Sequence, residues 1–227
     1  MENNFKENRT TELVFIIDRS GSMAGLESDT IGGFNSMISR QKKEKGDCRV
    51  TTVFFNNRVD VIHNRIDLMK MRPLPDSVFQ PGGCTAMLDA VGSSIQNMIS
   101  LQRYTDPASR ADKVLFVIIT DGMENASREY TWNRVRQMIR EERDRYGWEF
   151  IFLGANIDAE EVADDMGIDR RLAATYINDA AGVEENFRAM ANSVAMFCED
   201  DNNFAMPMEN IRQDYRKRSV FRNRNRK

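Results

Sequence analysis

The sequence contains one histidine and three cysteines, and this scarcity limits the chemistry that it can perform. Cys48, Cys84 and Cys198 are odd in number and lack CxxC spacing, so neither a disulfide framework nor a structural zinc site is indicated and reduced thiols are expected. Cys84 comes just before a predicted helix, where a lowered thiol pKa would suit redox sensing, but a small buried side chain is the favoured interpretation. His63 has no second histidine or nearby cysteine, so we expect a structural or exposed role.

Long hydrophobic runs are also missing. The longest, residues 13–17 and 114–119, are far shorter than the roughly 18 to 20 residues of a membrane-spanning helix. The first ten residues, MENNFKENRT, contain no apolar region of a secretory signal. Hydrophobic residues nevertheless make up 41% of the 227 residues, which is enough for a globular core. We therefore expect a soluble, cytoplasmic protein.

The charge is unevenly distributed along the chain. Residues 212–227 hold eight Lys or Arg and one acid, whereas the first 211 residues hold 24 basic and 34 acidic residues, a net charge of −10. An acidic body does not attract nucleic acid through its general field. Nucleic-acid binding would therefore rest on the basic tail, with Tyr215 and Phe221 available for stacking, and is the least favoured function.

Six segments of strand length, rich in β-branched or aromatic residues, predict strands. The strongest are nearly continuous apolar runs, as expected for strands buried on both faces of a parallel sheet. Asp158 and Glu161 resemble a capping box that opens a short helix. The predicted strands are residues 11–18, 48–55, 58–63, 113–120, 148–154 and 171–176, and apolar stripes at helical spacing lie within residues 31–38, 88–98, 132–146 and 183–197.

This alternation predicts an α/β fold with a doubly wound, mostly parallel six-stranded sheet and helices on both faces. Only Asn56 and Asn57 separate the second and third predicted strands. Such a link is too short for a parallel crossover, so the strand at 58–63 should be an antiparallel edge. We expect one domain, residues 11–200, with an irregular N-terminus at 1–10 and a C-terminal extension at 201–227 that forms a short helix and a basic tail.

Oxygen-bearing side chains stand where ligands bind in open α/β sheets, beyond the carboxyl ends of the strands. Asp18, Ser20 and Ser22 follow the first strand, Thr85 stands at the start of a helix, and Asp121 follows the strand at 113–120. Two carboxylates and three hydroxyls, without sulfur or imidazole, suit a hard cation such as Mg²⁺. Neutral hydroxyls quench little of the cation's charge, so an acidic side chain of a partner would be attracted to it.

The pattern Asp18-x-Ser20-x-Ser22, with a distant Thr85 and a distant Asp121-Gly122, resembles the metal-ion-dependent adhesion site (MIDAS) of von Willebrand factor type A (VWA) domains. The resemblance covers roughly residues 10–200 and is closest to bacterial intracellular members of unassigned function. It implies a Rossmann-like fold that holds Mg²⁺ or Mn²⁺. The serines and the threonine would contact the metal directly or through water, and the aspartates would largely hold its waters. It also implies that a protein partner's carboxylate completes the metal shell, without catalysis.

Other functions stay open at this point. Asp18, Ser20 and Ser22 are ordinary turn residues and would also suit a capped turn. A metal-dependent hydrolase or phosphotransferase on a similar sheet is the main alternative, although such phosphatases place a second aspartate where this chain has Ser20. The sequence contains no GxxxxGK[ST], GxSxG or HExxH motif, and no GxGxxG after the opening strand.

Three residues near the predicted site also have two interpretations. Glu124 and Asn125 would either contact a partner or form solvated surface, and solvated surface is slightly favoured. Asn156 follows the strand at 148–154 and would either support the site by hydrogen bonding or form a turn.

Overall fold

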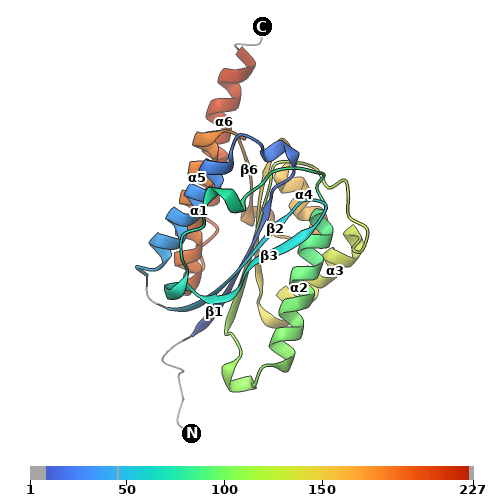
Figure 1. Cartoon of the computed structure of the whole chain (residues 1–227), viewed down its shortest axis with the longest axis vertical. Coiled ribbons are helices and arrows are strands. Elements are labelled where there is room, and N and C mark those ends of the chain that lie inside the picture. The colour runs from blue at the N-terminus through green and yellow to red at the C-terminus, as the bar shows by residue number, and fades with distance from the viewer. Residues whose placement is uncertain (1–8, 45, 225–227) are drawn as a thin grey trace.

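A six-stranded sheet lies at the centre of the computed structural model, which describes residues 9–44 and 46–224 (Figure 1). Its strand order is β3-β2-β1-β4-β5-β6, and β3 alone among the paired strands runs antiparallel to its neighbour. The predicted α/β class is confirmed. The strands are β1 (Thr10–Asp18), β2 (Asp47–Phe55), β3 (Val59–Asp67), β4 (Lys113–Thr120), β5 (Glu149–Ala155) and β6 (Ala173–Tyr176).

Helices cover both faces of this sheet (Figure 1). On one face α1 (Glu27–Gln41) packs against α5 (Ala180–Cys198). The other face carries α2 (Met87–Tyr104), α3 (Trp132–Tyr146) and α4 (Ala159–Met166), with α3 in contact with both neighbours. No helix within the described ranges is long and apolar enough to cross a membrane.

The central strands are apolar because both of their faces are covered. From Leu13 to Ile17 every side chain of β1 is buried, and so is every side chain of β4 from Val114 to Thr120. In the layer beneath the helices, Phe116 of β4 stacks on Phe150 of β5 with ring centroids 5.0 Å apart. Continuous burial explains why these strands lack the polar alternation of a half-exposed sheet.

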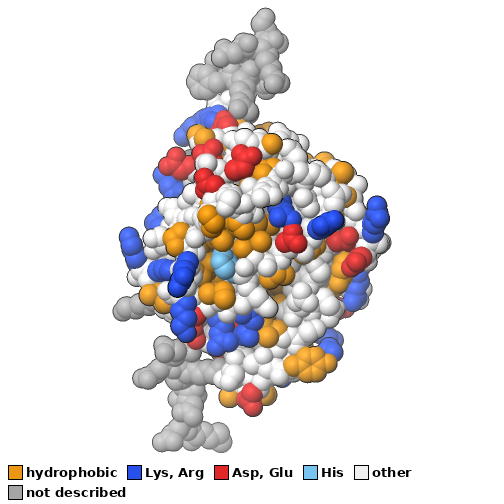
Figure 2. Space-filling view, viewed as in Figure 1, with side chains coloured by type: hydrophobic (Ala, Val, Ile, Leu, Met, Phe, Trp, Pro, Cys, Tyr) orange, Lys and Arg blue, Asp and Glu red, His pale blue; other side chains and the backbone are white. Residues whose placement is uncertain are grey.

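The antiparallel edge strand is confirmed, although it is longer than predicted. Phe55 pairs with Val59, and the turn between them is closed by the Asn56 side chain, which accepts a hydrogen bond from the Arg58 amide at 3.0 Å. The strand continues to Asp67, beyond the predicted end at His63. Val61 and Ile66 on this strand and Met69 just beyond it are exposed, and Figure 2 shows apolar side chains around the single histidine on this face.

The opposite edge of the sheet is covered by the C-terminal helix α6 (Met208–Arg224). Arg212 donates to the carbonyls of Arg170, Arg171 and Ala173 at 2.7–3.0 Å, at the start of β6. The helix therefore protects an edge that would otherwise expose unpaired backbone groups. It has 17 residues, whereas the sequence predicted a short helix and then a basic tail.

The predicted irregular segment 1–10 lies almost wholly outside the described residues, and Thr10 already begins β1.

We predict opposite effects on stability for alanine at two adjacent glycines of α1. A Cβ on Gly33 would lie 2.2 Å from a ring carbon of Phe187 in α5, so Gly33→Ala should lower the free energy of unfolding by about 1–3 kcal/mol. A Cβ on Gly32 would meet no atom within 4 Å, so Gly32→Ala should raise it by about 0.5–1 kcal/mol. Urea denaturation measures both; equal effects would contradict this close packing of α1 and α5.

Candidate metal centre

Asp18 is the last residue of β1, and its carboxylate is completely buried. One oxygen accepts a hydrogen bond from the Ser20 amide at 2.7 Å, and the other accepts from the Thr120 hydroxyl at 2.6 Å. Because Thr120 ends β4, these two bonds fix the carboxylate between the two central strands. Thr120 was not predicted to have a role, although its position directly before Asp121 at the strand end was a usable signal.

The loop after β1 brings its two serines to the aspartate that follows β4. The hydroxyls of Ser20 and Ser22 lie 3.1 Å apart, and Ser22 donates to Asp121 at 2.7 Å. The loop is held from outside by the Gly21 amide, which donates to the Gly83 carbonyl at 3.1 Å. Residues separated by about a hundred positions in the sequence therefore share one cluster.

Thr85 completes the cluster from the segment before α2. Its amide donates to the Asn125 side chain at 2.9 Å, and its carbonyl accepts from the Asn125 amide at 3.0 Å. A Cβ on Gly122 would lie 3.7 Å from the Thr85 hydroxyl and 3.8 Å from that of Ser22, so both hydroxyls flank the same glycine. The structure thus brings together all five predicted site residues, while their role as metal ligands stays a prediction.

The electrostatics of the cluster favour a cation. Burial raises the pKa of Asp18, hydrogen bonds from Thr120 and Ser20 lower it, and the charge of Asp121 raises it further. Burial also raises the pKa of Asp121, against hydrogen bonds that include those from Ser22 and Asn178. Within the described residues, neither aspartate has a Lys or Arg partner. Two buried carboxylates without a counter-charge are costly, and a divalent cation would supply that charge.

The donor set fits a hard cation and not a soft one. In the part of the chain that the structure describes, no three His, Cys, Asp or Glu side chains gather as a metal group. A metal at this cluster would instead depend on two carboxylates with the hydroxyls of Ser20, Ser22 and Thr85. Carboxylate and neutral oxygen ligands, completed by water, are what Mg²⁺ and Mn²⁺ accept.

The cluster opens to solvent on one side. Ser22 is exposed, whereas the other four predicted ligands are buried. Cys84 and Met123 are also exposed beside it, and the Cys84 amide donates to the Asn57 side chain at 2.8 Å. The prediction that Cys84 is a small buried side chain is therefore wrong: the loop at Gly82–Gly83 turns it outward from the start of α2.

Several neighbouring polar residues support the cluster. Asn178 donates to the second carboxylate oxygen of Asp121 at 3.0 Å, and Asn156 donates to the Asp121 carbonyl at 3.2 Å from a left-handed backbone with φ 58°. Asn156 therefore supports the site by hydrogen bonding, which is one of the two roles expected from the sequence. Asn178 was missed; its position two residues beyond β6, at the same edge of the sheet, was the only signal for it.

Glu124 and Asn125 both form hydrogen bonds with the start of α2 or the segment before it. The Glu124 carboxylate accepts from the Leu88 amide at 2.9 Å in the first turn of α2, and also from the Ser127 amide and hydroxyl. Together with the Asn125 contacts to Thr85, it anchors the loop after β4 onto the start of α2. The slightly favoured interpretation of a solvated surface is wrong for the half-buried Glu124, whereas Asn125 is exposed as expected and also bonds Thr85.

His63 lies away from this cluster, on the edge strand β3. One ring nitrogen lies 3.1 Å from the Thr52 hydroxyl, and burial lowers the pKa of the imidazole. Its structural role agrees with the sequence interpretation.

Comparison with solved structures identifies the architecture. The domain from the type V pilus tip protein Mfa5 of Porphyromonas gingivalis, described as a vWF domain, is 10% identical with a TM-score of 0.60, over 84% of this chain and 97% of that one. A von Willebrand factor type A protein from Catenulispora acidiphila is 16% identical with a TM-score of 0.54, over 81% and 42%. The chain has the VWA fold.

A third VWA-like neighbour is described with a metal in its site. Proximal thread matrix protein 1 from the mussel byssus, "with zinc occupied MIDAS motif", is 14% identical with a TM-score of 0.57, over 84% of this chain and 46% of that one. This chain thus spans less than half the length of the mussel and Catenulispora proteins. No family model and no curated protein matches the sequence.

We predict that the Thr120 hydroxyl is needed to keep the Asp18 carboxylate in place. Thr120→Val retains the side-chain shape but leaves a buried carboxylate oxygen without its donor, so the free energy of unfolding should fall by about 1–3 kcal/mol. Thr120→Ser keeps the hydroxyl and should lose less. Denaturant unfolding of the two variants makes the comparison; a larger loss for the serine variant would mean that the methyl group matters more than the hydrogen bond.

Proposed function

We propose that this VWA-fold chain is a divalent-metal-dependent protein-binding module that recognises an acidic residue of a protein partner. The observation that carries the proposal is the cluster of Asp18 and Asp121 with three hydroxyls. Both carboxylates are buried without a basic partner among the described residues, and the cluster is open to solvent at Ser22. We further propose Mg²⁺ or Mn²⁺ as the cation in an intact MIDAS. The zinc described at the MIDAS of the mussel neighbour supports divalent-metal binding in this fold.

The two aspartates have different tasks in this proposal. Asp18 is fully buried, and both of its carboxylate oxygens accept hydrogen bonds, from Ser20 and Thr120. It therefore acts mainly as a fixed negative charge. Asp121 is bonded by Ser22 and Asn178 and stands nearer to the exposed serine. The bound cation would supply an electrophilic centre at the open side. Ser22 then marks where a partner's carboxylate arrives.

We propose binding and not catalysis. The donor set supports this because it has no third titratable side chain: Ser20 stands two residues after Asp18, where a phosphatase would have an acid. Glu124, the nearest further carboxylate in sequence, is committed to backbone amides of α2 and its own loop. Hydrolysis of a phosphate ester that depends on Asp18 would overturn this part of the proposal.

The basic C-terminal segment supplies little support for nucleic-acid binding. Arg212 pairs with Glu160 at 3.0 Å, and Arg218 pairs with Asp179 and Asp214 at 2.5 and 3.0 Å. These arginines hold α6 to the domain, which leaves them less available for phosphates. Cytoplasmic location and membership of the bacterial intracellular type stay predictions from the sequence.

Metal binding predicts a specific stabilisation. With Mg²⁺ at about 100 times its Kd, the free energy of unfolding should rise by roughly 2.7 kcal/mol if the unfolded chain does not bind. Asp18→Ala and Asp121→Asn should each abolish the rise, because each removes one of the two carboxylates of the proposed metal site. Glu141→Ala, which removes an exposed carboxylate on α3, is the control and should keep it. Thermal unfolding with Mg²⁺ and with chelator tests this; an undiminished rise in both aspartate variants would place the metal elsewhere.

Partner binding should depend on the same residues. We expect proteins captured on the immobilised chain in Mg²⁺ to be released by chelator and not to be captured by the Asp121→Asn variant. For a captured partner, changing one Asp or Glu to its amide should abolish binding, because the amide lacks the charge that the cation attracts. Binding that persists in chelator, or survives every such change in the partner, would contradict recognition of a carboxylate.

A further inference from the structure

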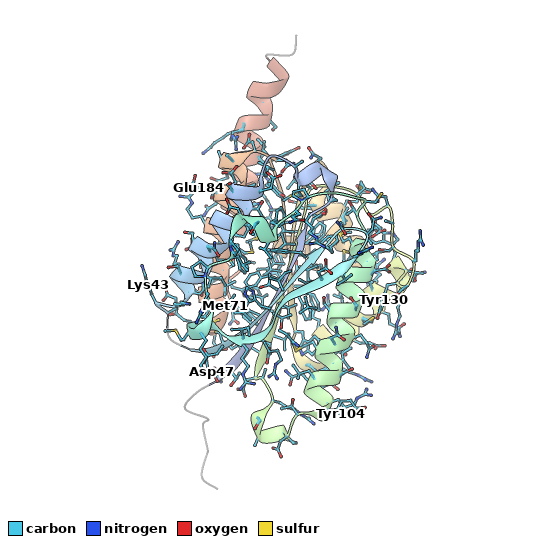
Figure 3. All side chains as sticks on the ribbon, viewed as in Figure 1. Lys43, Asp47, Met71, Tyr104, Tyr130 and Glu184 are labelled. Carbon is cyan, nitrogen blue, oxygen red and sulfur yellow. The ribbon has the colours of Figure 1, made fainter. Side chains whose placement is uncertain are left out.

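Two cysteines that are far apart in the sequence lie side by side at the end of the sheet opposite the candidate metal centre. Cys48 is the second residue of β2 and Cys198 is the last residue of α5, and their sulfur atoms are 3.7 Å apart. Asp47, labelled in Figure 3, marks this end of the sheet. To form a disulfide, the two sulfur atoms would approach from this contact distance to a bond length of about 2.05 Å.

The surroundings make the two thiols unequal. The two thiols share a hydrogen bond in which either sulfur can be the donor. This hydrogen bond lowers the pKa of the Cys198 thiol; burial opposes it, and a hydrogen bond from Thr11 and the nearby Lys113 ammonium group lower the pKa further. Lys113 is held there by the carbonyls of Phe197 and Cys198, at 2.7 and 3.0 Å. The pKa of the Cys48 thiol is raised by its hydrogen bond with Cys198 and by burial.

This asymmetry suits stepwise oxidation. The attacking sulfur must be a thiolate, and it must be reachable by the oxidant. Cys198 is partly exposed and its lowered pKa favours the thiolate. Cys48 is buried beside it, and its raised pKa favours the protonated thiol. The exposed Cys84 lies at the opposite end of the sheet, beside the candidate metal centre.

We propose that Cys48 and Cys198 form a reversible disulfide when the protein meets hydrogen peroxide. The Cys198 thiolate attacks one peroxide oxygen and the O–O bond breaks, which gives a sulfenic acid and hydroxide; the hydroxide takes up the proton lost by Cys198 and becomes water. Cys48 sulfur then attacks Cys198 sulfur and the S–O bond breaks. The departing hydroxide takes the Cys48 proton as a second water. The two thiols lose two electrons and the peroxide gains them.

The disulfide would fasten the last residue of α5 covalently to β2. Without it, that end of the helix depends on packing and on the Lys113 contacts to its carbonyls. The two residues are 150 positions apart, so the bond closes a long loop of the unfolded chain and should raise stability markedly.

Oxidation of the full-length chain tests the proposal. Peroxide treatment of Cys84→Ser should lower the intact mass by two hydrogens and give one cross-linked peptide pair containing Cys48 and Cys198, which dithiothreitol separates. The double variants Cys84→Ser/Cys48→Ser and Cys84→Ser/Cys198→Ser serve as controls and should give no cross-link within the chain. Conversion of Cys198 to its sulfinic acid in Cys84→Ser without a cross-link, or cross-links only between chains, would overturn the proposal.

Thermal unfolding gives an independent readout. Oxidised Cys84→Ser should melt about 5–10 °C above its reduced form, and dithiothreitol should remove the difference. Cys84→Ser/Cys48→Ser should show no such increase after the same treatment. An unchanged melting temperature in cross-linked protein would mean that the bond does not fasten α5.

Discussion

The buried carboxylate of Asp18 is the constraint on which the carboxyl edge of the sheet depends. A charge with no exposed surface at the end of a central strand must be compensated where it stands. The Ser20 amide and the Thr120 hydroxyl do so in part, and they fix the direction in which the chain leaves β1 and the alignment of β1 with β4. The remaining charge is what makes a cation at this edge physically sensible.

The loops around the carboxylate are held to one another by hydrogen bonds within the chain. Asn56 donates to the Gly82 carbonyl at 2.7 Å, and the Arg19 carbonyl accepts from the Gly82 amide at 3.0 Å, so the turn after β2 supports the loop that presents Thr85. Gly83 has a φ of 79°, and a Cβ there would lie 2.1 Å from the Asn57 side chain. The donor positions are therefore largely set before any ligand arrives, which lowers the cost of organising them on binding.

The sequence allowed prediction of those features that depend on local pattern. Apolar runs located the strands, the short link at Asn56 predicted the antiparallel edge, and the rule that ligands bind at the carboxyl ends of strands brought Asp18, Thr85 and Asp121 together. Side-chain contacts that supporting residues make from other segments were not predicted. Asn178 donates to Asp121, which is 57 positions away in the sequence. Arg212 donates to backbone carbonyls, whereas a basic run by itself indicates only a solvated surface.

Helix α5 connects the two chemically distinct ends of the sheet. Its first residues follow Asn178, which holds Asp121, and its last residue is Cys198, which touches Cys48. A helix of 19 residues extends about 28 Å and is stiff along its axis, so both contacts constrain one body. Phe187 packs so closely on Gly33 that this body has little freedom to roll against α1. The close packing at Gly33 therefore holds the middle of the helix against α1, and a bond at Cys198 would hold its last residue to β2.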